Sequence, residues 1–154
     1  MVERYARKVM SDKWSMQAKY DAWLKVEIAA VKAWNKLGFI PDNDCQKICE
    51  NAKFDIARID EIEKTTKHDV IAFLTSVSES LGDESRFVHF GMTSSDCIDT
   101  AVALQIKDSM ELILDDVKTL MNTIQIRANE HKNTLMVGRS HGIHGEPITF
   151  GLVL

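Results

Sequence analysis

The feature that most constrains the fold is a long segment, from Asp96 to about Glu130, that contains neither glycine nor proline. Apolar side chains recur along it near the helical period, at Ile98, Val102, Ile106, Met110, Ile113, Val117, Leu120, Met121 and Ile124. A single helix over this segment is on the order of 50 Å long at about 1.5 Å per residue. Because so long a helix cannot bury its apolar face against a small domain, we expect an elongated helical bundle, formed within one subunit or between subunits.

The residues before this segment predict several shorter helices. The clearest begins at Met16 and ends at Leu37, because Gly38 is suited to the position after a helix and Pro41 follows. Further helices are expected over 42–51, after an Asp55 cap, and over 70–81. The first 13 residues have no clear period and are interpreted as a solvated arm, and 87–91 as a short extended piece.

The fold class expected is therefore all-α. We expect a small helical N-terminal domain over residues 1–91, followed over residues 92–154 by the start of a long-helix bundle domain. No β-hairpin signal or internal repeat is found in the sequence.

The segment 137–147 concentrates glycines with side chains that can do chemistry. It contains Gly138, Gly142 and Gly145, and between them Arg139, Ser140, His141 and His144. Since each glycine costs roughly 0.5 to 1 kcal/mol inside a helix or strand, we expect a shaped loop.

Pro147 is expected to open a helix. The apolar residues after it run to Leu154 without a cap, so we expect the chain to be the N-terminal part of a longer polypeptide.

Composition excludes some functions. A net charge of −4 and a pI near 5.7 give no basic stripe for a phosphate backbone, so nucleic acid is not an expected partner. No apolar run is long enough to span a membrane. Met1 to Lys8 is polar and charged, unlike a signal peptide, and the odd set of Cys45, Cys49 and Cys97 predicts reduced thiols in the cytoplasm. Cys45 and Cys49 lack further ligands for a metal.

Three polar clusters interrupt the apolar helical pattern: 67–69, 93–96 and 138–144. All three stand at expected helix entrances, where free backbone N–H groups point outward and favour an anion. Each has more hydroxyl or charged groups than one helix cap needs. An anion-binding site is one interpretation, and plain capping together with a polar turn is the other.

In order and spacing these clusters resemble the adenylosuccinate lyase family, within the fumarase and aspartase superfamily. The similar segments are 66–73, 88–96 and 138–147, with Glu3-Arg4-Tyr5 at the start, so the resemblance covers essentially the whole chain. Ser140 and Gly145 stand where the family more often has threonine and alanine, and both changes keep the chemistry.

The resemblance implies a reversible elimination that breaks a C–N bond and releases fumarate. The substrates would be adenylosuccinate, giving AMP, and the succinylated aminoimidazole carboxamide ribotide of purine biosynthesis. It also implies a cytoplasmic homotetramer with active sites shared between subunits, a small-molecule nucleotide substrate, and neither a metal nor an organic cofactor. The family's general base is a serine on a downstream loop, and no segment of this chain matches it. We therefore expect the 154-residue chain alone to be inactive.

The resemblance also assigns roles to residues. His141 would be the general acid and His68 would assist it, since an imidazole titrates near the working pH. Sequence alone does not rank these two. Substrate-binding residues would be Arg4, Tyr5, Lys67, His68, Asp69, Thr93, Ser94, Ser140 and His89, with His89 equally well explained as a structural histidine. Two alternatives stay open: another lyase of the superfamily, such as one acting on argininosuccinate, and a non-catalytic helical scaffold.

Overall fold

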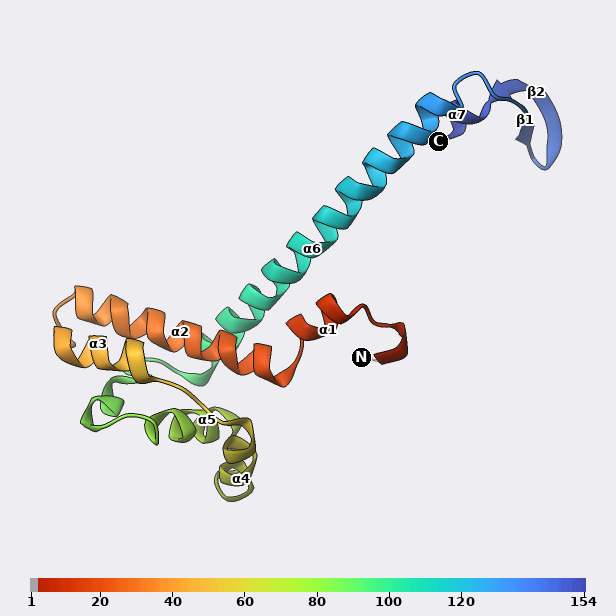
Figure 1. The fold of residues 1–154 in the computed structure, drawn as a ribbon. Coiled ribbons are helices and arrows are strands. Elements are labelled where there is room, and N and C mark those ends of the chain that lie inside the picture. The colour runs from red at the N-terminus through yellow and green to blue at the C-terminus, as the bar shows by residue number, and fades with distance from the viewer. Residues whose placement is uncertain (1–2) are drawn as a thin grey trace. The chain divides into compact units, whose positions relative to one another are not determined.

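The computed structural model describes residues 3–154, and this part of the chain is mainly helical (Figure 1). Met1 and Val2, at the start of the expected arm, lie outside the described residues. The elements are η1 Glu3–Tyr5, α1 Lys8–Lys13, α2 Met16–Lys36, α3 Asp42–Asn51, α4 Ile56–Thr66, α5 Asp69–Ser78, η2 Asp83–Phe87, α6 Ser94–Glu130, β1 Leu135–Ser140, β2 Ile143–Thr149 and α7 Phe150–Val153. The predicted helical fold class is confirmed, with one two-stranded sheet added to it.

The chain divides into two compact units, Met1–Ser109 and Met110–Leu154, and each is described by itself. The domain division expected at residue 91 stays a prediction. Among the described residues, no helix combines the length and the apolar character needed to cross a membrane.

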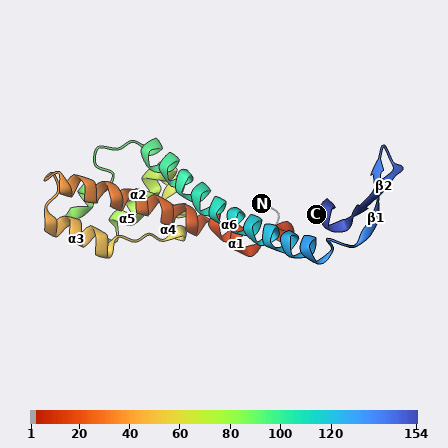
Figure 2. The same ribbon diagram turned by 90° about the horizontal axis from the view of Figure 1, so that it is seen from above.

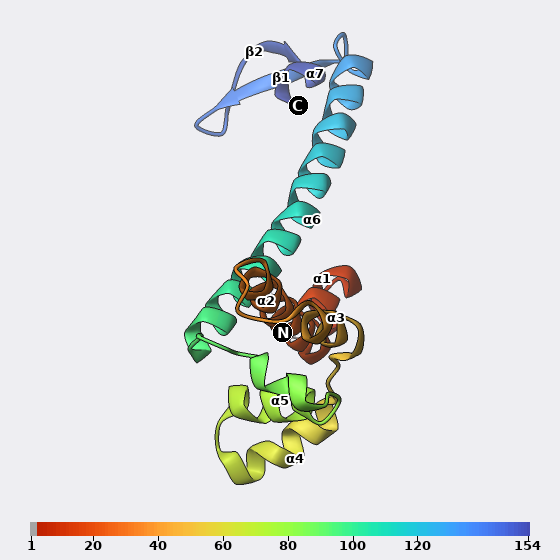
Figure 3. The same cartoon turned by 90° about the vertical axis from the view of Figure 1, so that its left-hand side faces the viewer.

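Local capping explains the bounds of the first helices. Ser15 Oγ accepts a hydrogen bond from the Ala18 N–H at 3.1 Å and starts α2, and Gly38, with φ of +80°, follows its C-cap residue. Asp55 Oδ1 accepts from the Arg58 N–H at 2.8 Å and starts α4. Helix α3 contacts α2, and α4 packs on α5 (Figures 1 and 3). The predictions of α2, of α3 and of the Asp55 cap are confirmed.

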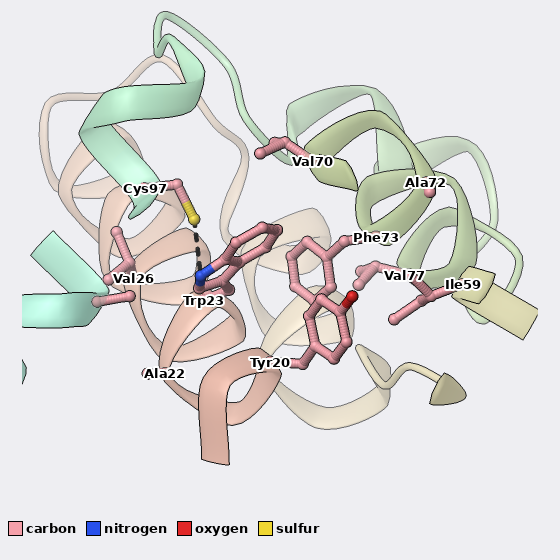
Figure 4. Close-up of a cluster of buried hydrophobic side chains, with 11 residues drawn as sticks. Tyr20, Ala22, Trp23, Val26, Ile59, Val70, Ala72, Phe73, Val77 and Cys97 are labelled. Atoms are coloured by element: carbon pink, nitrogen blue, oxygen red, sulfur yellow. Dashed lines mark hydrogen bonds between the residues drawn. The ribbon is translucent and has the colours of Figure 1, made fainter. Parts of the chain in front are cut away.

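The main core of residues 3–109 is built around aromatic rings. Tyr20 and Phe73 stack with centroids 5.6 Å apart, and the Trp23 ring meets both edge-on at 5.3 and 5.4 Å (Figure 4). The Cys97 side chain, from α6, donates to the Trp23 carbonyl at 3.7 Å. The three rings therefore hold α2 against α5, and the first turn of α6 packs on the same cluster.

Helix α6 is one unbroken helix of 37 residues, as its sequence predicts (Figure 2). Its buried residues are small or polar: Cys97, Ala101, Gln105 and Ser109. The predicted apolar stripe lies on another face and is exposed at Val102, Ile106, Met110, Ile113, Val117, Leu120 and Met121. Within the described residues these seven side chains belong to no core cluster, whereas Ile98, at the start of the stripe, packs on the main core.

The glycine-rich segment is a β-hairpin, and the expectation of a loop outside any strand was wrong. Strands β1 and β2 pair antiparallel, with Leu135 opposite Thr149 and Ser140 opposite Ile143 (Figure 3). The two residues between them, His141 and Gly142, have φ of +53° and +77°. Two consecutive left-handed residues form the tight turn that matches the twist of a hairpin, and this gain outweighs the cost of glycine in the strands.

Several expected boundaries also differ. Pro147 lies in β2 and not at a helix start, because each strand of a two-stranded sheet has a free edge where a missing N–H is tolerated. Helix α5 ends at Ser78, short of the expected Leu81. The arm contains a short helix, α1, with an ion pair between Lys8 and Asp12 at 2.8 Å. Residues 88–91 form a turn and are not extended.

The aromatic core predicts a large stability difference between two phenylalanines. Phe73 is fully buried, whereas Phe39 is 62% exposed, although its ring also meets a tryptophan edge-on at 5.2 Å. We expect Phe73→Ala to lower the free energy of unfolding by about 3 to 5 kcal/mol, through lost burial and the cavity left behind. Phe39→Ala should cost less than about 1 kcal/mol. Urea unfolding measures both, and equal losses would contradict this description of the core.

Candidate functional site

The first polar cluster forms the junction between α4 and α5. Lys67 is the C-cap of α4 in a left-handed conformation, with φ of +53°. His68 is the N-cap of α5, and its Nδ1 accepts a hydrogen bond from the Ile71 N–H at 3.4 Å. A neutral ring that accepts at Nδ1 carries its proton on Nε2. His68 therefore presents Nε2–H as a donor, on a side chain that is about half exposed.

Asp69 supplies a negative charge at the same helix entrance. Its Oδ1 accepts from the Val70 N–H at 2.8 Å, and its Oδ2 lies 3.9 Å from Lys19 Nζ. Lys19 also lies over the ring of Trp23, 4.5 Å from the centroid. Two of the N–H groups that were expected to receive an external anion are thus bonded by His68 and Asp69. The groups left for a ligand are the side chains of this cluster more than its backbone.

The second cluster is capped differently. Asp96 Oδ2 accepts from the Thr93 N–H at 2.8 Å, and the Asp96 N–H donates to the Thr93 carbonyl at 3.0 Å. With this pair, the Thr93 and Asp96 N–H groups at the start of α6 are bonded without any hydroxyl. Within residues 3–154, the hydroxyls of Thr93, Ser94 and Ser95 make no hydrogen bond. Three hydroxyl donors are therefore left at a helix N-terminus.

The turn before this cluster is bonded to α2. Glu27 is 1% exposed, and its carboxylate contacts His89 twice: Oε2 accepts the main-chain N–H at 2.9 Å, and Oε1 lies 2.7 Å from Nδ1. Trp34 Nε1 donates to the Phe90 carbonyl at 2.9 Å. His89 therefore has a structural role in this unit, and its Nδ1 is occupied.

The hairpin carries the third cluster. His141 is the first turn residue, Ser140 ends β1, and Arg139 lies opposite His144. All four side chains are exposed. Among the described residues, none of the four forms a side-chain hydrogen bond or an ion pair. The hairpin thus holds two imidazoles, a hydroxyl and a guanidinium on a defined backbone, with their polar atoms available.

Arg4 and Tyr5 lie in η1 near the N-terminus. The Arg4 guanidinium is 4.7 Å from the centroid of the Tyr5 ring, and Tyr5 is 77% exposed. This contact keeps a cation and an aromatic ring together on the surface.

The predicted site residues thus fall into two groups. Arg4, Tyr5, the 67–69 cluster, His89 and the 93–96 cluster belong to the first unit, and Ser140 and His141 to the second. Within residues 3–154, no group of three or more histidine, cysteine or acidic side chains is placed to hold a metal ion.

Sequence reasoning missed Glu27, Trp34 and Lys19, the α2 residues that contact these clusters. One signal was present for Glu27: it falls on the apolar face of α2, four residues after Trp23 and four before Val31. A charged residue on a core face needs a buried partner.

Comparisons with known proteins cover the whole chain. A family model described as Lyase matches residues 3–154. An adenylosuccinate lyase from Helicobacter pylori (strain ATCC 700392 / 26695) is 63% identical over 154 residues, which is 100% of this chain and 35% of that protein. An adenylosuccinate lyase from Bacillus subtilis (strain 168) is 51% identical over 154 residues, 36% of its length. The chain thus spans about a third of the length of these relatives.

Solved structures share the fold. A fumarate lyase from Mesorhizobium sp. BNC1 matches with a TM-score of 0.88 at 27% identity, over 95% of this chain and 35% of that one. A 3-carboxy-cis,cis-muconate lactonizing enzyme from Pseudomonas putida matches with a TM-score of 0.81 at 25% identity, over 97% of this chain and 36% of that one.

The buried thiol of Cys97, next to Glu27, is predicted to be unreactive. Burial, then the nearby Glu27 carboxylate, raise the pKa of Cys97 to about 12. The folded protein therefore keeps this thiol protonated at pH 8.5, and only thiolates alkylate readily. We expect iodoacetamide at that pH to modify the partly exposed Cys49 and to leave Cys97 unmodified, by mass spectrometry of peptides. In urea both should react. Equal labelling of the two in the folded protein would contradict the description.

Proposed function

The chain belongs to the lyase family, and on that premise we propose that it contributes the N-terminal part of an adenylosuccinate lyase. The reaction would be elimination of fumarate from adenylosuccinate, giving AMP, and from the succinylated aminoimidazole carboxamide ribotide of purine biosynthesis. The observation that carries this proposal is 63% identity to an adenylosuccinate lyase along all 154 residues. Since the chain spans 35% of that relative, the activity is proposed for the longer protein.

The elimination needs three kinds of group. A base removes a proton from the carbon beside one succinyl carboxylate, and the electrons of that C–H bond form the double bond of fumarate. The C–N bond breaks, and the nitrogen keeps its electron pair and takes a proton from an acid. Negative charge builds on the carboxylate next to the reacting carbon, where donors stabilise it. We assign the acid and the donors to this chain and leave the base to the rest of the protein.

We propose His141 as the acid, assisted by His68. The assignment of His141 is supported by its place at the hairpin turn, where the backbone is fixed and no described residue forms a hydrogen bond with its imidazole. A positioned histidine is suited to proton transfer because its pKa ordinarily lies near neutrality. His68, with Nε2–H as donor, is proposed either to contact the substrate or to tune His141.

Thr93 and Ser94 are proposed to bind a succinyl carboxylate. Their hydroxyls are not used for capping, because Asp96 does that work, and they stand at the N-terminus of a long helix. Ser140, beside His141, is proposed to donate in the same way.

The nucleotide part of the substrate is assigned to the remaining residues. Arg4 and Tyr5 are proposed to bind it, since a guanidinium pairs well with phosphate. Lys67 and Asp69 are proposed to line the pocket. His89 is proposed as a phosphate contact through Nε2 alone, since Glu27 occupies Nδ1.

A homotetramer with shared active sites completes the proposal. The exposed apolar stripe of α6 supports it, because residues such as Ile113, Val117 and Leu120 recur every three to four positions on a helix that no described residue covers there. A cytoplasmic location is also proposed, supported by three free cysteines.

Substrate choice tests the function directly. We expect the full-length protein to release fumarate from adenylosuccinate and not from argininosuccinate, and the 154-residue chain alone to release none. Release from argininosuccinate only would move the protein to the alternative within the superfamily, and release from neither would refute a lyase of either kind.

The acid role predicts a large effect on turnover from one exposed histidine. In the full-length enzyme, His141→Ala should lower kcat by about 100-fold or more without dissociating the tetramer, since a positioned acid contributes about that much. His144→Ala, three residues further along the same hairpin, is the matched control and should keep most of the activity. A small effect of His141→Ala would transfer the acid role to His68.

Mixed tetramers separate the two histidines further. If His141 and His68 of one active site come from different subunits, His141→Ala and His68→Ala subunits expressed together should regain partial activity. Well-mixed tetramers that stay inactive would count against a shared site.

A further inference from the structure

The turn at residues 88–91 has a backbone that needs outside support. His89 has φ of +65° and Gly91 has φ of +71°, so two of three consecutive residues are left-handed. Glycine adopts this region freely, but a histidine there is strained, and neighbouring contacts are needed to hold it.

Glu27 provides the main contact. One carboxylate binds His89 at two points, the main-chain N–H at 2.9 Å and the ring Nδ1 at 2.7 Å. Two bonds from one rigid group fix both the peptide plane and the imidazole ring. Glu27 is 1% exposed, and a buried carboxylate is stable only with partners. Glu27 therefore holds His89 in place, and His89 in turn stabilises the buried charge of Glu27.

Trp34 provides a second contact from the same helix. It lies seven residues after Glu27, two helical turns along α2, and its Nε1–H donates to the Phe90 carbonyl at 2.9 Å. Its ring also lies against Gly91, where an added Cβ would come within 3.0 Å of the Trp34 Cζ2 atom. Helix α2 thus holds residues 89, 90 and 91 in turn.

The position of this turn decides where the hydroxyl cluster begins. The Met92 N–H donates back to the His89 carbonyl at 3.3 Å, and Thr93 and Ser94 follow directly. A different φ at His89 would redirect the chain just before these two residues, and their hydroxyls would be displaced together.

We propose that Glu27 is a positioning residue for substrate binding: by bonding His89 at two points it fixes the turn that places Thr93 and Ser94. This inference rests on the proposed function, in which these hydroxyls receive a succinyl carboxylate. Glu27 itself does not touch the substrate.

The test uses variants of the full-length enzyme that keep the buried volume. Glu27→Met removes both acceptors. Glu27→Gln keeps an acceptor for the His89 N–H, and its amide can donate to Nδ1 once the ring proton moves to Nε2, so it should rescue. Ser76→Ala is the control, because Ser76 is also buried and accepts a main-chain N–H, that of Asp55 at 3.1 Å, in another part of the unit. Trp34→Phe removes the hydrogen bond to the Phe90 carbonyl, and it replaces Glu27→Met as the test variant if Glu27→Met does not fold.

KM separates positioning from a purely structural role. Loss of folded enzyme lowers the apparent kcat and leaves KM unchanged, whereas displaced carboxylate donors weaken binding and raise KM. We expect Glu27→Met to raise KM for adenylosuccinate by about tenfold or more and Trp34→Phe by less, with Glu27→Gln and Ser76→Ala near the wild-type value. An unchanged KM in both Glu27→Met and Trp34→Phe would overturn the proposal.

Hydrogen exchange at the His89 amide provides a readout that needs no substrate. It should become faster in Glu27→Met and stay unchanged in Ser76→Ala, because only the first variant loses the acceptor of that N–H. If exchange at the His89 amide were unchanged in Glu27→Met, the proposal that Glu27 holds the turn would be overturned, even if activity fell. A wild-type enzyme without lyase activity would refute the proposed function, and the exchange result would then still decide whether Glu27 holds the turn.

Discussion

One face of α2 determines the structure of most of residues 3–109. Its first half carries Tyr20 and Trp23, whose rings pack on Phe73 and fix α5. Its second half carries Glu27 and Trp34, whose polar atoms bond the turn before α6. A single rigid helix therefore connects the apolar core to two of the polar clusters, because α5 begins at the first cluster and α6 at the second. Rigid support of this kind is what a binding site needs, since misplaced groups lose most of their effect.

The two helix entrances differ in a way that matters for function. At α5, His68 and Asp69 bond the free N–H groups, and the Asp69 carboxylate supplies the negative charge that a helix N-terminus favours. At α6, the Asp96 carboxylate accepts from the Thr93 N–H, and the hydroxyls of Thr93 and Ser94 are left without a partner among the described residues. This difference is the reason for proposing that a substrate carboxylate binds at the second entrance and that the first contributes side-chain contacts.

Much of this fold was readable from the sequence, because caps and periodicity are local. Ser15, Gly38 and Asp55 mark helix ends through bonds to residues within a few positions. Helix α6 was predictable because its sequence contains neither glycine nor proline. The hairpin was missed because its turn is His-Gly and not the familiar Asn-Gly, and because glycines in the strands obscured the alternation. The Glu27 and His89 pair was missed for another reason: the partners are 62 residues apart, so only the folded chain brings them together. The candidate site shows the same division, since its residue types were readable but the bonds that place them were not.

Helix α6 shows why the periodicity of a sequence does not reveal what a helical face packs against. The apolar stripe was correctly identified, yet the side that meets this chain's own core is the one with Cys97, Ala101, Gln105 and Ser109. Small side chains there let α6 approach the aromatic cluster closely, and Gln105 donates from this face to the Lys13 carbonyl at 2.9 Å. An apolar stripe left uncovered on so long a helix is unfavourable in water, by roughly 25 cal/mol for each Å². The sequence of α6 therefore has two different faces: one with small and polar side chains that packs within the chain, and an apolar one that the described residues leave exposed over residues 102–121.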